Sequence, residues 1–389
     1  MRTAGRTETT AGVGDPGPVG DVRPAPPAAA GPRGRPRGGR ARGSRPLGSR
    51  PLGRRALLAG LVGIVLLVAS IVVAVTLGPA ELSPGEVLAS LAAHLGFGEP
   101  TLSPLRDGIV WQLRMPRVLT AAAVGAGLAL CGAVMQAITR NPLADPYLLG
   151  LSSGASVGAV VVLVLGWGLL LPLAAFGGAV LALVATLGLA LAAGRGGRLA
   201  PTTTVLAGIA VTSVFGAVTS LVIFWSATND SYREILNWLL GSLSGTDWSS
   251  VAIAGGALLV VGAPLVASAR TLDAFAVGES GAAALGVHVA RSRALLLGGT
   301  ALLTGALVAV SGSIGFVGLV LPHAVRLVTG PGHRALLPLS ALAGAIFLVW
   351  ADTGARTLFD PRELPVGILT ALIGGPVFAW LLLRSRRTA

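Results

Sequence analysis

Three arginines occupy unusual places along the chain. Arg114 and Arg117 lie on either side of a proline at the start of a long apolar segment, and Arg356 follows the stretch ADTGA near the end of another. A guanidinium group carries a permanent charge and five donors in a fixed fork, which suits it to pairing with carboxylates. These side chains could pair with acids such as Asp107 or Asp352, or extend their charged ends to a membrane surface.

The basic residues of this chain are all of one kind. All 29 are arginine, and none is lysine. A phosphate-binding loop of the Walker type requires a lysine, and so does a Schiff base, so the chain can form neither. If nucleotide hydrolysis drives this protein, another subunit must supply it. The single cysteine, Cys131, lies in an apolar run and cannot form a disulfide within the chain.

Membrane-spanning helices must position these residues. Of the 389 residues, 53% are hydrophobic and 12% are charged, with a mean hydropathy of +0.79, whereas soluble domains carry about 25% charged residues. A spanning helix needs about 20 apolar residues, and continuous apolar runs are not the alternating pattern of a membrane barrel. We therefore predict an all-α polytopic membrane protein with ten spans. The predicted spans are residues 56–77, 116–138, 146–166, 172–193, 202–226, 249–268, 293–311, 313–329, 335–355 and 365–383.

The distribution of charge predicts the orientation of these spans. With the N-terminal tail inside, ten spans return the C-terminus to the same side. Segments assigned inside then hold 23 of the 29 arginines against six acids, and segments assigned outside hold six arginines against ten acids. This bias follows the positive-inside rule. We expect a multi-pass protein of the cell membrane with both termini in the cytoplasm.

Residues 1–55 differ in composition from the rest. They hold 12 arginines among glycine, proline and alanine, so we expect a disordered cytoplasmic tail. Beside a membrane span, an anchor near anionic lipid is favoured over a nucleic-acid-binding arm. Arg54 and Arg55 also resemble a twin-arginine export signal, but the apolar run that follows is too long and lacks a cleavage pattern. Residues 56–384 form the predicted transmembrane domain, and residues 385–389 a short cytoplasmic tail.

Two segments assigned outside are amphipathic rather than spanning. Residues 83–96 begin with serine and proline and carry apolar residues at helical spacing, and residues 231–248 are similar but richer in tryptophan. Prolines predict the starts of several spans, because the first helical position needs no backbone N–H. Pro116, Pro146 and Pro365 are each expected to open a span.

Six stretches together resemble the permease subunits of ABC importers for iron-siderophores, haem and cobalamin, the FecCD class. They are LRMPR (113–117), GAVMQAITRNPLADPYLLGLSSGASVGA (132–159), LNWLLGSLSGTDW (236–248), GESGAAALGV (278–287), GSIGFVGLVLPHAVRLVTGPGHR (312–334) and ELPVGILTALIGGPVFAWLL (363–382). The resemblance covers nearly everything from residue 56 to 384. It implies a type II importer bundle of ten spans per subunit, working as a homodimer with two ATP-binding subunits and an extracytoplasmic substrate-binding protein. The chain itself would catalyse no covalent step.

Residues 278–293, between the sixth and seventh predicted spans, are expected to form a short helix at the inner membrane surface, since an alanine-rich stretch is followed there by a glycine and two arginines. Without the resemblance this segment is an ordinary amphipathic loop. The resemblance implies that it is the coupling helix that seats in a cleft of the ATPase subunit. The matching positions are Glu279, Ala283, Leu285 and Gly286.

The resemblance also assigns roles at both ends of the bundle. Thr202 and Thr203, at the inner start of the fifth span, match a turn that narrows the pathway and are candidate gate residues, although threonines at such a place also cap helices. Arg114, Arg117 and Arg356 match basic pockets that receive acidic side chains of the binding protein. Charge pairs of this kind set docking register and on-rate more than affinity.

Other polar residues are expected to be structural. Asn141 and Asp145, each followed by a proline, predict a turn and a helix cap. His323 lies beside a proline with no partner histidine, cysteine or carboxylate at ligand spacing, so a hydrogen bond at a helix kink is favoured over a metal site. We expect no metal and no cofactor bound by this chain.

The sequence thus favours the permease subunit of a binding-protein-dependent ABC importer for iron(III)-siderophores, with cobalamin or haem as alternative cargoes. An ion-coupled secondary transporter would normally carry ionisable residues within its spans, and these contain almost none beyond Asp352. A purely structural scaffold would not need a coupling segment. No residue identifies the cargo, and a heterodimer with a related permease stays open.

Overall fold

The computed structural model describes residues 53–78, 80–97, 102–194, 200–226, 229–359 and 362–385. The chain divides into residues 1–50 and residues 51–389, and the fold is that of the second unit. Most of the predicted tail 1–55 lies outside the described residues, and so do all but the first residue of the predicted tail 385–389.

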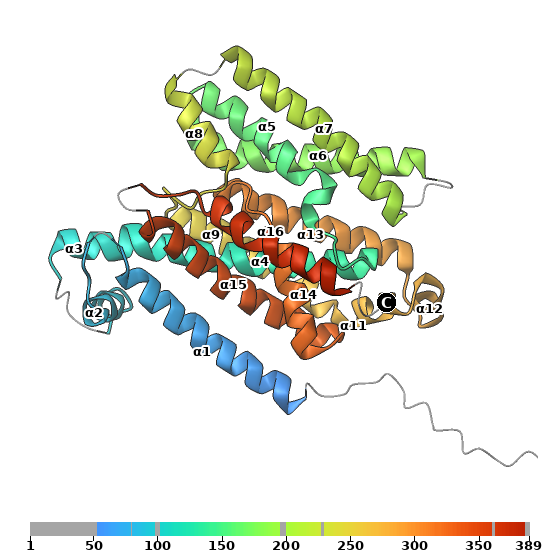
Figure 1. Ribbon diagram of the computed structural model, residues 1–389, viewed down its shortest axis with the longest axis horizontal. Coiled ribbons are helices and arrows are strands. Elements are labelled where there is room, and N and C mark those ends of the chain that lie inside the picture. The colour runs from blue at the N-terminus through green and yellow to red at the C-terminus, as the bar shows by residue number, and fades with distance from the viewer. Residues whose placement is uncertain are drawn as a thin grey trace, which may run out of the picture. The chain divides into compact units, whose positions relative to one another are not determined.

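The described residues form helices joined by turns (Figure 1). Seven helical segments are long and apolar enough to cross a membrane, and three shorter apolar helices, α5, α14 and α16, accompany them. The described part of the chain is therefore all-helical, with several helices that could span a membrane. The helices are α1 Arg54–Thr76, α2 Pro84–His94, α3 Pro104–Gly108, α4 Met115–Thr139, α5 Leu151–Val164, α6 Leu171–Ala193, α7 Pro201–Ser226, α8 Asn229–Leu239, α9 Trp248–Ala257, α10 Ala263–Ala267, α11 Ala269–Ala276, α12 Glu279–Ala284, α13 Val289–Ser311, α14 Val317–Thr329, α15 His333–Thr357 and α16 Val366–Ser385.

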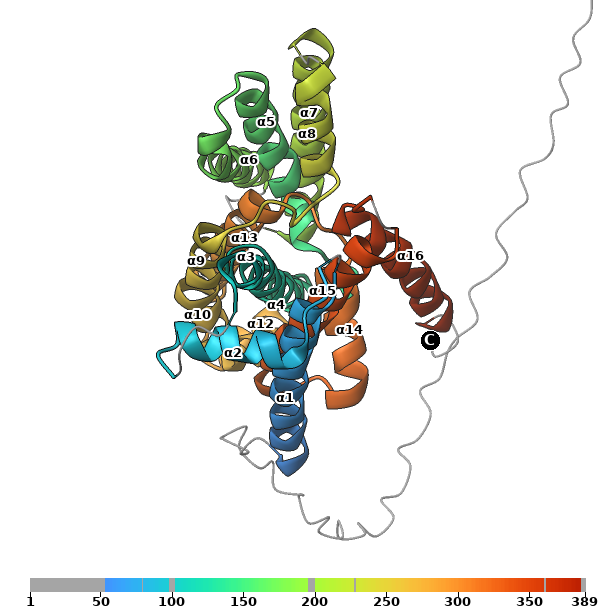
Figure 2. The ribbon, with the colours of Figure 1, turned by 90° about the vertical axis from the view of Figure 1, so that its left-hand side faces the viewer.

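Helix α4 lies at the centre and packs against α9, α13, α14 and α15 (Figure 2). Glycines allow its backbone to approach its neighbours closely. A Cβ atom on Gly132 would lie 1.8 Å from the carbonyl oxygen of Gly318 on α14, and one on Gly125 would lie 2.2 Å from that of Gly344 on α15. Small residues serve this purpose in membrane helices, where packing rather than the hydrophobic effect holds helices together.

Helices α5, α6, α7 and α8 form a second group beside this central one (Figure 1). Within it, α5 and α6 meet through Gly154 and Gly178, where an added Cβ would lie 2.1 to 2.3 Å from a backbone oxygen. Helix α6 packs against α13, and this contact joins the two groups. Much of α7 is exposed, including Leu206, Val214 and Phe224.

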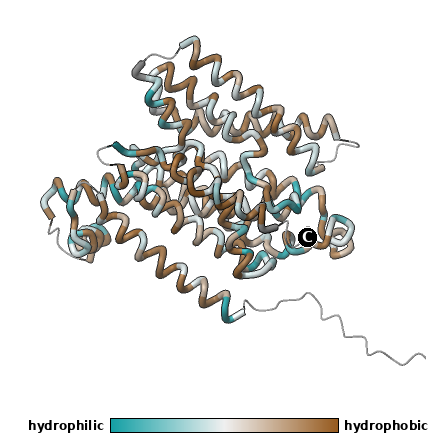
Figure 3. The backbone as a smooth tube through the Cα atoms, viewed as in Figure 1, coloured by the Kyte–Doolittle hydropathy of each residue, from teal (hydrophilic) through white to brown (hydrophobic). Residues whose placement is uncertain are grey.

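Helix α1 is hydrophobic along most of its length (Figure 3), and many of its large apolar side chains are exposed. It packs on α15 and α2, and its other faces present residues such as Leu61, 61% exposed, and Val65, 60% exposed. Large apolar side chains exposed along a whole helix are stable only in contact with lipid or another apolar surface. This pattern fits a helix at the edge of a membrane-embedded bundle.

Pro116 does not start its helix, contrary to the prediction. A continuous helical segment runs from Pro104 to Thr139, and it contains a π-helical stretch, Ile109–Arg114 (η1). A second π-helical stretch, Leu258–Gly262 (η4), precedes Pro264 in the same way. Because a proline ring clashes with the preceding turn of an α-helix, the wider π turn makes room for it, and both stretches end two residues before a proline.

Other predicted boundaries shift at residues with a left-handed backbone. The third predicted span is broken at Gly150, φ 77°, into a 3-10 turn, Pro146–Leu149 (η2), and α5. The eighth begins only after Phe316, φ 68°. The predicted surface helix 231–248 ends at Leu239, because Gly241, φ 75°, turns the chain towards the segment before α14. The seventh span begins earlier than predicted, at Val289.

The predicted surface helix 83–96 is α2, and its start is a capping box. Ser83 accepts a hydrogen bond from the backbone of Glu86, whose carboxylate accepts one from the backbone of Ser83. The backbone N–H and the hydroxyl of Ser83 both donate to this carboxylate and lower the pKa of Glu86. At the other end of α2, His94 stacks on Trp111 with 4.0 Å between ring centroids, and Trp111 meets Trp248. The stack fixes α2 against η1 and α9.

The close contact at Gly132 gives a testable expectation. In Gly132→Ala the new methyl group forces α4 and α14 apart, and we expect a loss of about 1–3 kcal/mol of stability, typical of overpacking. Gly255→Ala is the matched control, because its Cβ would meet nothing within 4 Å. Thermal unfolding of the purified protein in detergent, followed by tryptophan fluorescence, measures both. Equal melting temperatures for Gly132→Ala and the unmodified protein would contradict the packing described.

Candidate functional site

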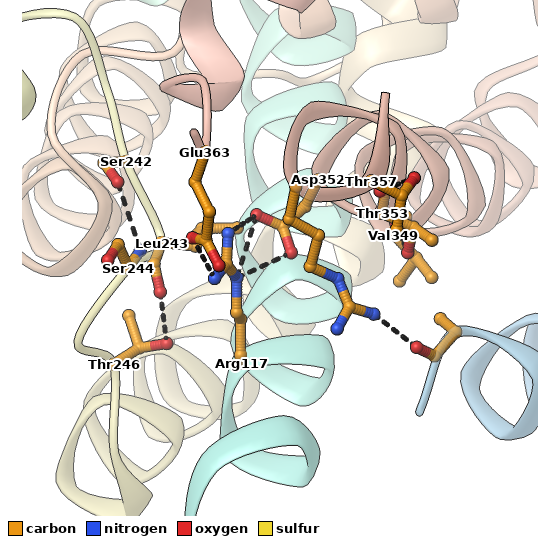
Figure 4. Close-up of polar contacts among 12 residues, drawn as sticks. Arg117, Ser242, Leu243, Ser244, Thr246, Val349, Asp352, Thr353, Thr357 and Glu363 are labelled. Carbon is orange, nitrogen blue, oxygen red and sulfur yellow. Dashed lines mark hydrogen bonds and ion pairs between the residues drawn. The ribbon is translucent and has the colours of Figure 1, made fainter. Parts of the chain in front are cut away.

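Arg117 forms the centre of a charged cluster where the N-terminal part of α4 meets the C-terminal part of α15 (Figure 4). Its guanidinium donates from Nε and Nη2 to the carboxylate of Asp352, at 2.9 and 3.0 Å, and from Nη1 to Glu363 at 2.7 Å. The Asp352 side chain is 2% exposed, that of Arg117 13% and that of Glu363 45%. A two-point contact between guanidinium and carboxylate is among the strongest polar pairings in proteins.

Arg114 is buried and bonds to the backbone at the end of α1. It donates from Nη1 to the carbonyl oxygens of Val75 and Thr76, at 2.9 and 3.0 Å, and from Nη2 to that of Ala80, at 2.7 Å. The last carbonyls of a helix have no partner within the helix and form its negative end. Gly78 makes room for this contact, since a Cβ there would lie 2.8 Å from Nη2 of Arg114.

Arg356 completes the same arrangement from α15. It is 5% exposed and donates from Nη2 to the carbonyl oxygen of Ala74 in α1. It lies one helical turn after Asp352, so the acid stands on the same face of α15, within range of both Arg117 and Arg356. The side chain therefore supports the end of α1 as Arg114 does.

The structure thus brings the three predicted arginines together and gives each a partner. The cluster contains three guanidinium groups and two carboxylates, which leaves one positive charge. Of the two acids considered from the sequence, Asp352 is a partner, whereas Asp107 bonds to Ser90 and lies 3.5 Å from His94. Glu363 was not predicted as a partner. The sequence analysis assigned it to the same side of the membrane as the three arginines, and that assignment could have marked it as a candidate.

The predicted coupling segment contains α12, a helix of six residues at the opposite end of the bundle. Leu285 is 54% exposed, and Ala283 and Gly286 are also exposed. Glu279 has a different role, because its carboxylate accepts a hydrogen bond from buried Arg293 at 2.7 Å. The ion pair fixes the start of α12 to α13, while the other three residues face outwards.

Thr202 and Thr203 lie in the first turn of α7, after Pro201. Thr202 is exposed and Thr203 half-buried. The neighbouring Thr204 is buried and donates from its hydroxyl to the carbonyl oxygen of Ala200 at 2.9 Å. The hydroxyls of Thr202 and Thr203 therefore lie nearer the protein surface than that of Thr204.

Asp145 caps η2 by accepting a hydrogen bond from the backbone of Tyr147 at 2.8 Å, and this confirms the predicted cap. Asp145 is half-buried, and the loss of contact with water raises the pKa of its carboxyl group to about 6. The hydroxyl of Tyr147 donates to the carbonyl oxygen of Ile314 and accepts from its N–H. The turn between α4 and α5 is thereby fixed to the segment before α14.

A cavity of about 360 Å³ lies among α5, α7, α8 and η2. Hydroxyl groups dominate its polar lining. Several of them donate to the carbonyl one turn back in their own helix, as Ser156 does to Ser152 and Thr219 to Phe215, so they present acceptor oxygens to the cavity. The lining residues are Tyr147, Ser152, Ser153, Ser156, Thr212, Gly216, Thr219 and Leu239.

The described residues contain no group of three or more histidine, cysteine, aspartate or glutamate side chains placed to hold a metal ion. His323 lies in α14 directly after Pro322, which stands inside that helix. In the described part of the chain, the candidate functional groups are thus the arginine cluster, α12 and the hydroxyl-lined cavity.

Comparison with known proteins decides the family. The model of the FecCD transport family matches residues 66–384. The chain belongs to the FecCD transport family. It is 43% identical over 339 residues to YvrB of Bacillus subtilis, an uncharacterised ABC transporter permease, with 85% of this chain and 94% of YvrB covered.

Other members of the family carry named cargoes. The chain is 45% identical over 293 residues to the cobalamin import permease BtuC of Halobacterium salinarum, covering 75% of this chain and 77% of that one. It is 42% identical over 281 residues to the hemin transport permease HmuU of Yersinia pestis, covering 71% and 84%. Its relatives in the FecCD family are thus transport permeases.

The fold agrees with this assignment. An inward-facing structure described as a metal-chelate type ABC transporter superposes with a TM-score of 0.73 at 33% sequence identity, covering 84% of this chain and 99% of that one. The protein is therefore an ABC importer permease of the class that contains BtuC and HmuU, a multi-pass membrane subunit.

The pairing of Arg117 with Asp352 gives a second expectation. Arg117→Ala leaves a buried carboxylate without its counter-charge, so we expect a loss of about 3–5 kcal/mol. The double variant Arg117→Ala with Asp352→Ala removes both charges and is expected to lose less than Arg117→Ala alone. Thermal unfolding in detergent compares the two single variants with the double.

The exposed pair of Arg106 and Glu86 is the matched control for this cycle. Its side chains are 45% and 26% exposed, and exposed ion pairs contribute at most about 1 kcal/mol. Arg106→Ala should therefore change stability little. A strictly additive cycle for Arg117 and Asp352 would show that the buried pair contributes no more than the exposed one.

Proposed function

We propose that this FecCD-family permease forms the translocation pathway for iron(III)-siderophores, driven by ATP hydrolysis on partner subunits. The observation that carries the importer assignment is the conjunction of the family match over residues 66–384 with an exposed short helix, α12, at the end of the bundle opposite the arginine cluster. Siderophores are the cargo that the sequence resemblance favours. Cobalamin and haem are the alternatives, as the names of BtuC and HmuU indicate.

The proposal includes ten spans, with α5, α14 and α16 completing the set of seven long segments. Each of the ten apolar segments predicted from the sequence contains one of these helices. The arginine bias then places the α12 end and both termini in the cytoplasm. The exposed apolar face of α7 supports a homodimer, since such a surface suits contact with a second copy.

We assign the cavity beside α7 to the middle of the translocation pathway, with its lining residues facing the cargo. It presents hydroxyl and apolar groups but no charged side chain. A lining of this kind lets a bulky cargo pass without tight binding, because no strong pairing has to be broken at each step. Thr202 and Thr203, at the end of α7 assigned inside, are the proposed cytoplasmic gate.

Helix α12 is the proposed contact with an ATP-binding subunit. The ion pair between Glu279 and Arg293 joins α12 to α13. A movement of the ATP-binding subunit against α12 would therefore displace α13, which packs on α4, α6 and α9. Leu285 is the proposed anchor, with Ala283 and Gly286 allowing close approach. Two copies of the chain would present two such contacts, one to each ATP-binding subunit.

The arginine cluster is the proposed docking site for the extracytoplasmic binding protein. Arg117 is the member that an incoming carboxylate can reach, because Glu363, its exposed partner, can be displaced by another acid. Arg114 and Arg356 add positive charge from beneath while holding the end of α1. Complementary charge at such a surface acts mainly on the rate of association.

Replacing Leu285 tests the coupling. We expect Leu285→Asp to weaken association with the ATP-binding subunit roughly 30-fold, the loss typical of a buried apolar anchor, and to abolish cargo uptake. Leu95→Asp is the matched control, since Leu95 is 62% exposed at the opposite end. Co-purification with the ATP-binding subunit and uptake into proteoliposomes are the measurements. Normal co-purification of the Leu285→Asp variant would remove this contact from the proposal.

Uptake assays test the cargo. Proteoliposomes containing the permease, its ATP-binding subunit and its binding protein are expected to take up ferric siderophore only when ATP is supplied. Uptake of labelled cobalamin or haem instead would overturn the siderophore assignment while keeping the importer. Uptake that runs on an ion gradient without ATP would identify a secondary transporter and reject the importer itself.

A further inference from the structure

A groove of about 520 Å³ lies between α1 and α10, with α4 and α15 as its floor. Its lining is wholly apolar. Alanines supplied by α4, Ala122, Ala123 and Ala126, keep the floor low, whereas Ile64 of α1 and Leu258 of η4 form bulky walls. The volume is within the range of about 300–1,000 Å³ typical of small-molecule sites.

The side chains around the groove are apolar and exposed, as expected of a surface that faces the hydrocarbon of a membrane. Leu259 and Val260, next to one wall, are 73% and 75% exposed, and Ile64 on the other wall is 52% exposed. In a membrane subunit these side chains contact hydrocarbon. Because no polar group lines the groove, water would find no hydrogen-bond partners there. An apolar chain is the occupant that the lining can accept.

One end of the groove carries positive charge. Arg334 stands four residues before Pro338, a lining residue of the same helix α15, and therefore on the same face one turn further out. Arg270 is exposed and stands four residues beyond Val266, which lines the opposite wall. Asp273 of α11 accepts a hydrogen bond from the backbone N–H of His333, the first residue of α15, and lies 2.7 Å from Nδ1 of its ring. The starts of α11 and α15, which carry Arg270 and Arg334, therefore lie together at this end of the groove.

We propose that this groove binds one acyl chain of an anionic phospholipid, with the phosphate of that lipid held by Arg270 and Arg334. The apolar lining accounts for the chain, and the two guanidinium groups at one end account for the headgroup. Arginine near a membrane surface attracts anionic lipid. The lipid would add a contact between α1 and the rest of the bundle, where α1 otherwise packs mainly on α15.

Photolabelling of the full chain in lipid nanodiscs tests this site. The probe is phosphatidylglycerol with a photoreactive diazirine in one acyl chain, and the comparison probe is phosphatidylcholine with the same chains. We expect phosphatidylglycerol to label peptides containing residues 258–266 and 338–345 more strongly than phosphatidylcholine does. Mass spectrometry of the digested protein locates the label.

Two pairs of variants separate the chain site from the headgroup site. Ala263→Trp fills the groove from its exposed rim and is expected to abolish labelling there, whereas Ala252→Trp, exposed on α9 outside the groove, is expected to keep it. Arg270→Gln should lower labelling by phosphatidylglycerol about fivefold and leave phosphatidylcholine unchanged, while Arg291→Gln, an exposed arginine of α13, should alter neither.

Size-exclusion chromatography checks that each variant is folded, and Ala263→Leu replaces the tryptophan variant if that one aggregates. Equal labelling by the two lipids, or labelling that survives filling of the groove, would reduce the site to ordinary lipid contact and overturn the proposal. A separate experiment with a bifunctional cross-linker would also overturn the proposal if it joined the groove to a second copy of the chain or to another protein. None of these outcomes depends on which cargo the permease carries.

Discussion

A guanidinium and a carboxylate held together away from water attract each other far more strongly than in solution, and Arg117 and Asp352 form such a pair between α4 and α15. The arrangement of α1, α4 and α15 at this end of the bundle depends on this contact. Asp352 also stands one helical turn before Arg356 in α15. Arg356 in turn donates a hydrogen bond to the end of α1. Arg114 reaches the same helix end from α4. Arg114, Arg117, Asp352 and Arg356 thus hold α1, α4 and α15 together at one point.

The same helices are held along their length by contacts of a different kind. Gly125 and Gly132 let the backbone of α4 touch those of α15 and α14, and such contacts tolerate no added methyl group. A bundle built in this way moves as packed units rather than by gradual deformation, since closely packed interfaces switch between discrete arrangements. The segment α5 to α8, which carries the hydroxyl-lined cavity, joins the central group mainly through α13.

Much of this architecture could be predicted from the sequence, because apolar runs of membrane length leave a helix few alternatives. The positions of the long helices follow that pattern. The cap at Asp145 follows from an aspartate placed before a proline, and the short helix α12 from an alanine-rich stretch that ends at a glycine. The continuation of the helix before α4, from Pro104 through η1, could not be predicted in this way. Pro116 is typical of a first helical position, yet a π turn before it lets the helix continue, and whether such a turn forms depends on the neighbours against which η1 packs. The bend at Gly241 likewise follows from contact with the segment before α14.

The sequence by itself determined the class of protein, the absence of a lysine-dependent phosphate loop and the set of arginines worth attention, since composition and hydropathy act locally along the chain. Only the tertiary structure decided what those arginines touch. Arg114 and Arg356 bond to carbonyls of a helix some 40 and 280 residues away in the chain, and Arg117 pairs with acids beyond residue 350. The physical reason is that a buried charge selects its partner by proximity in space, and the packing of α1, α4 and α15 sets that proximity.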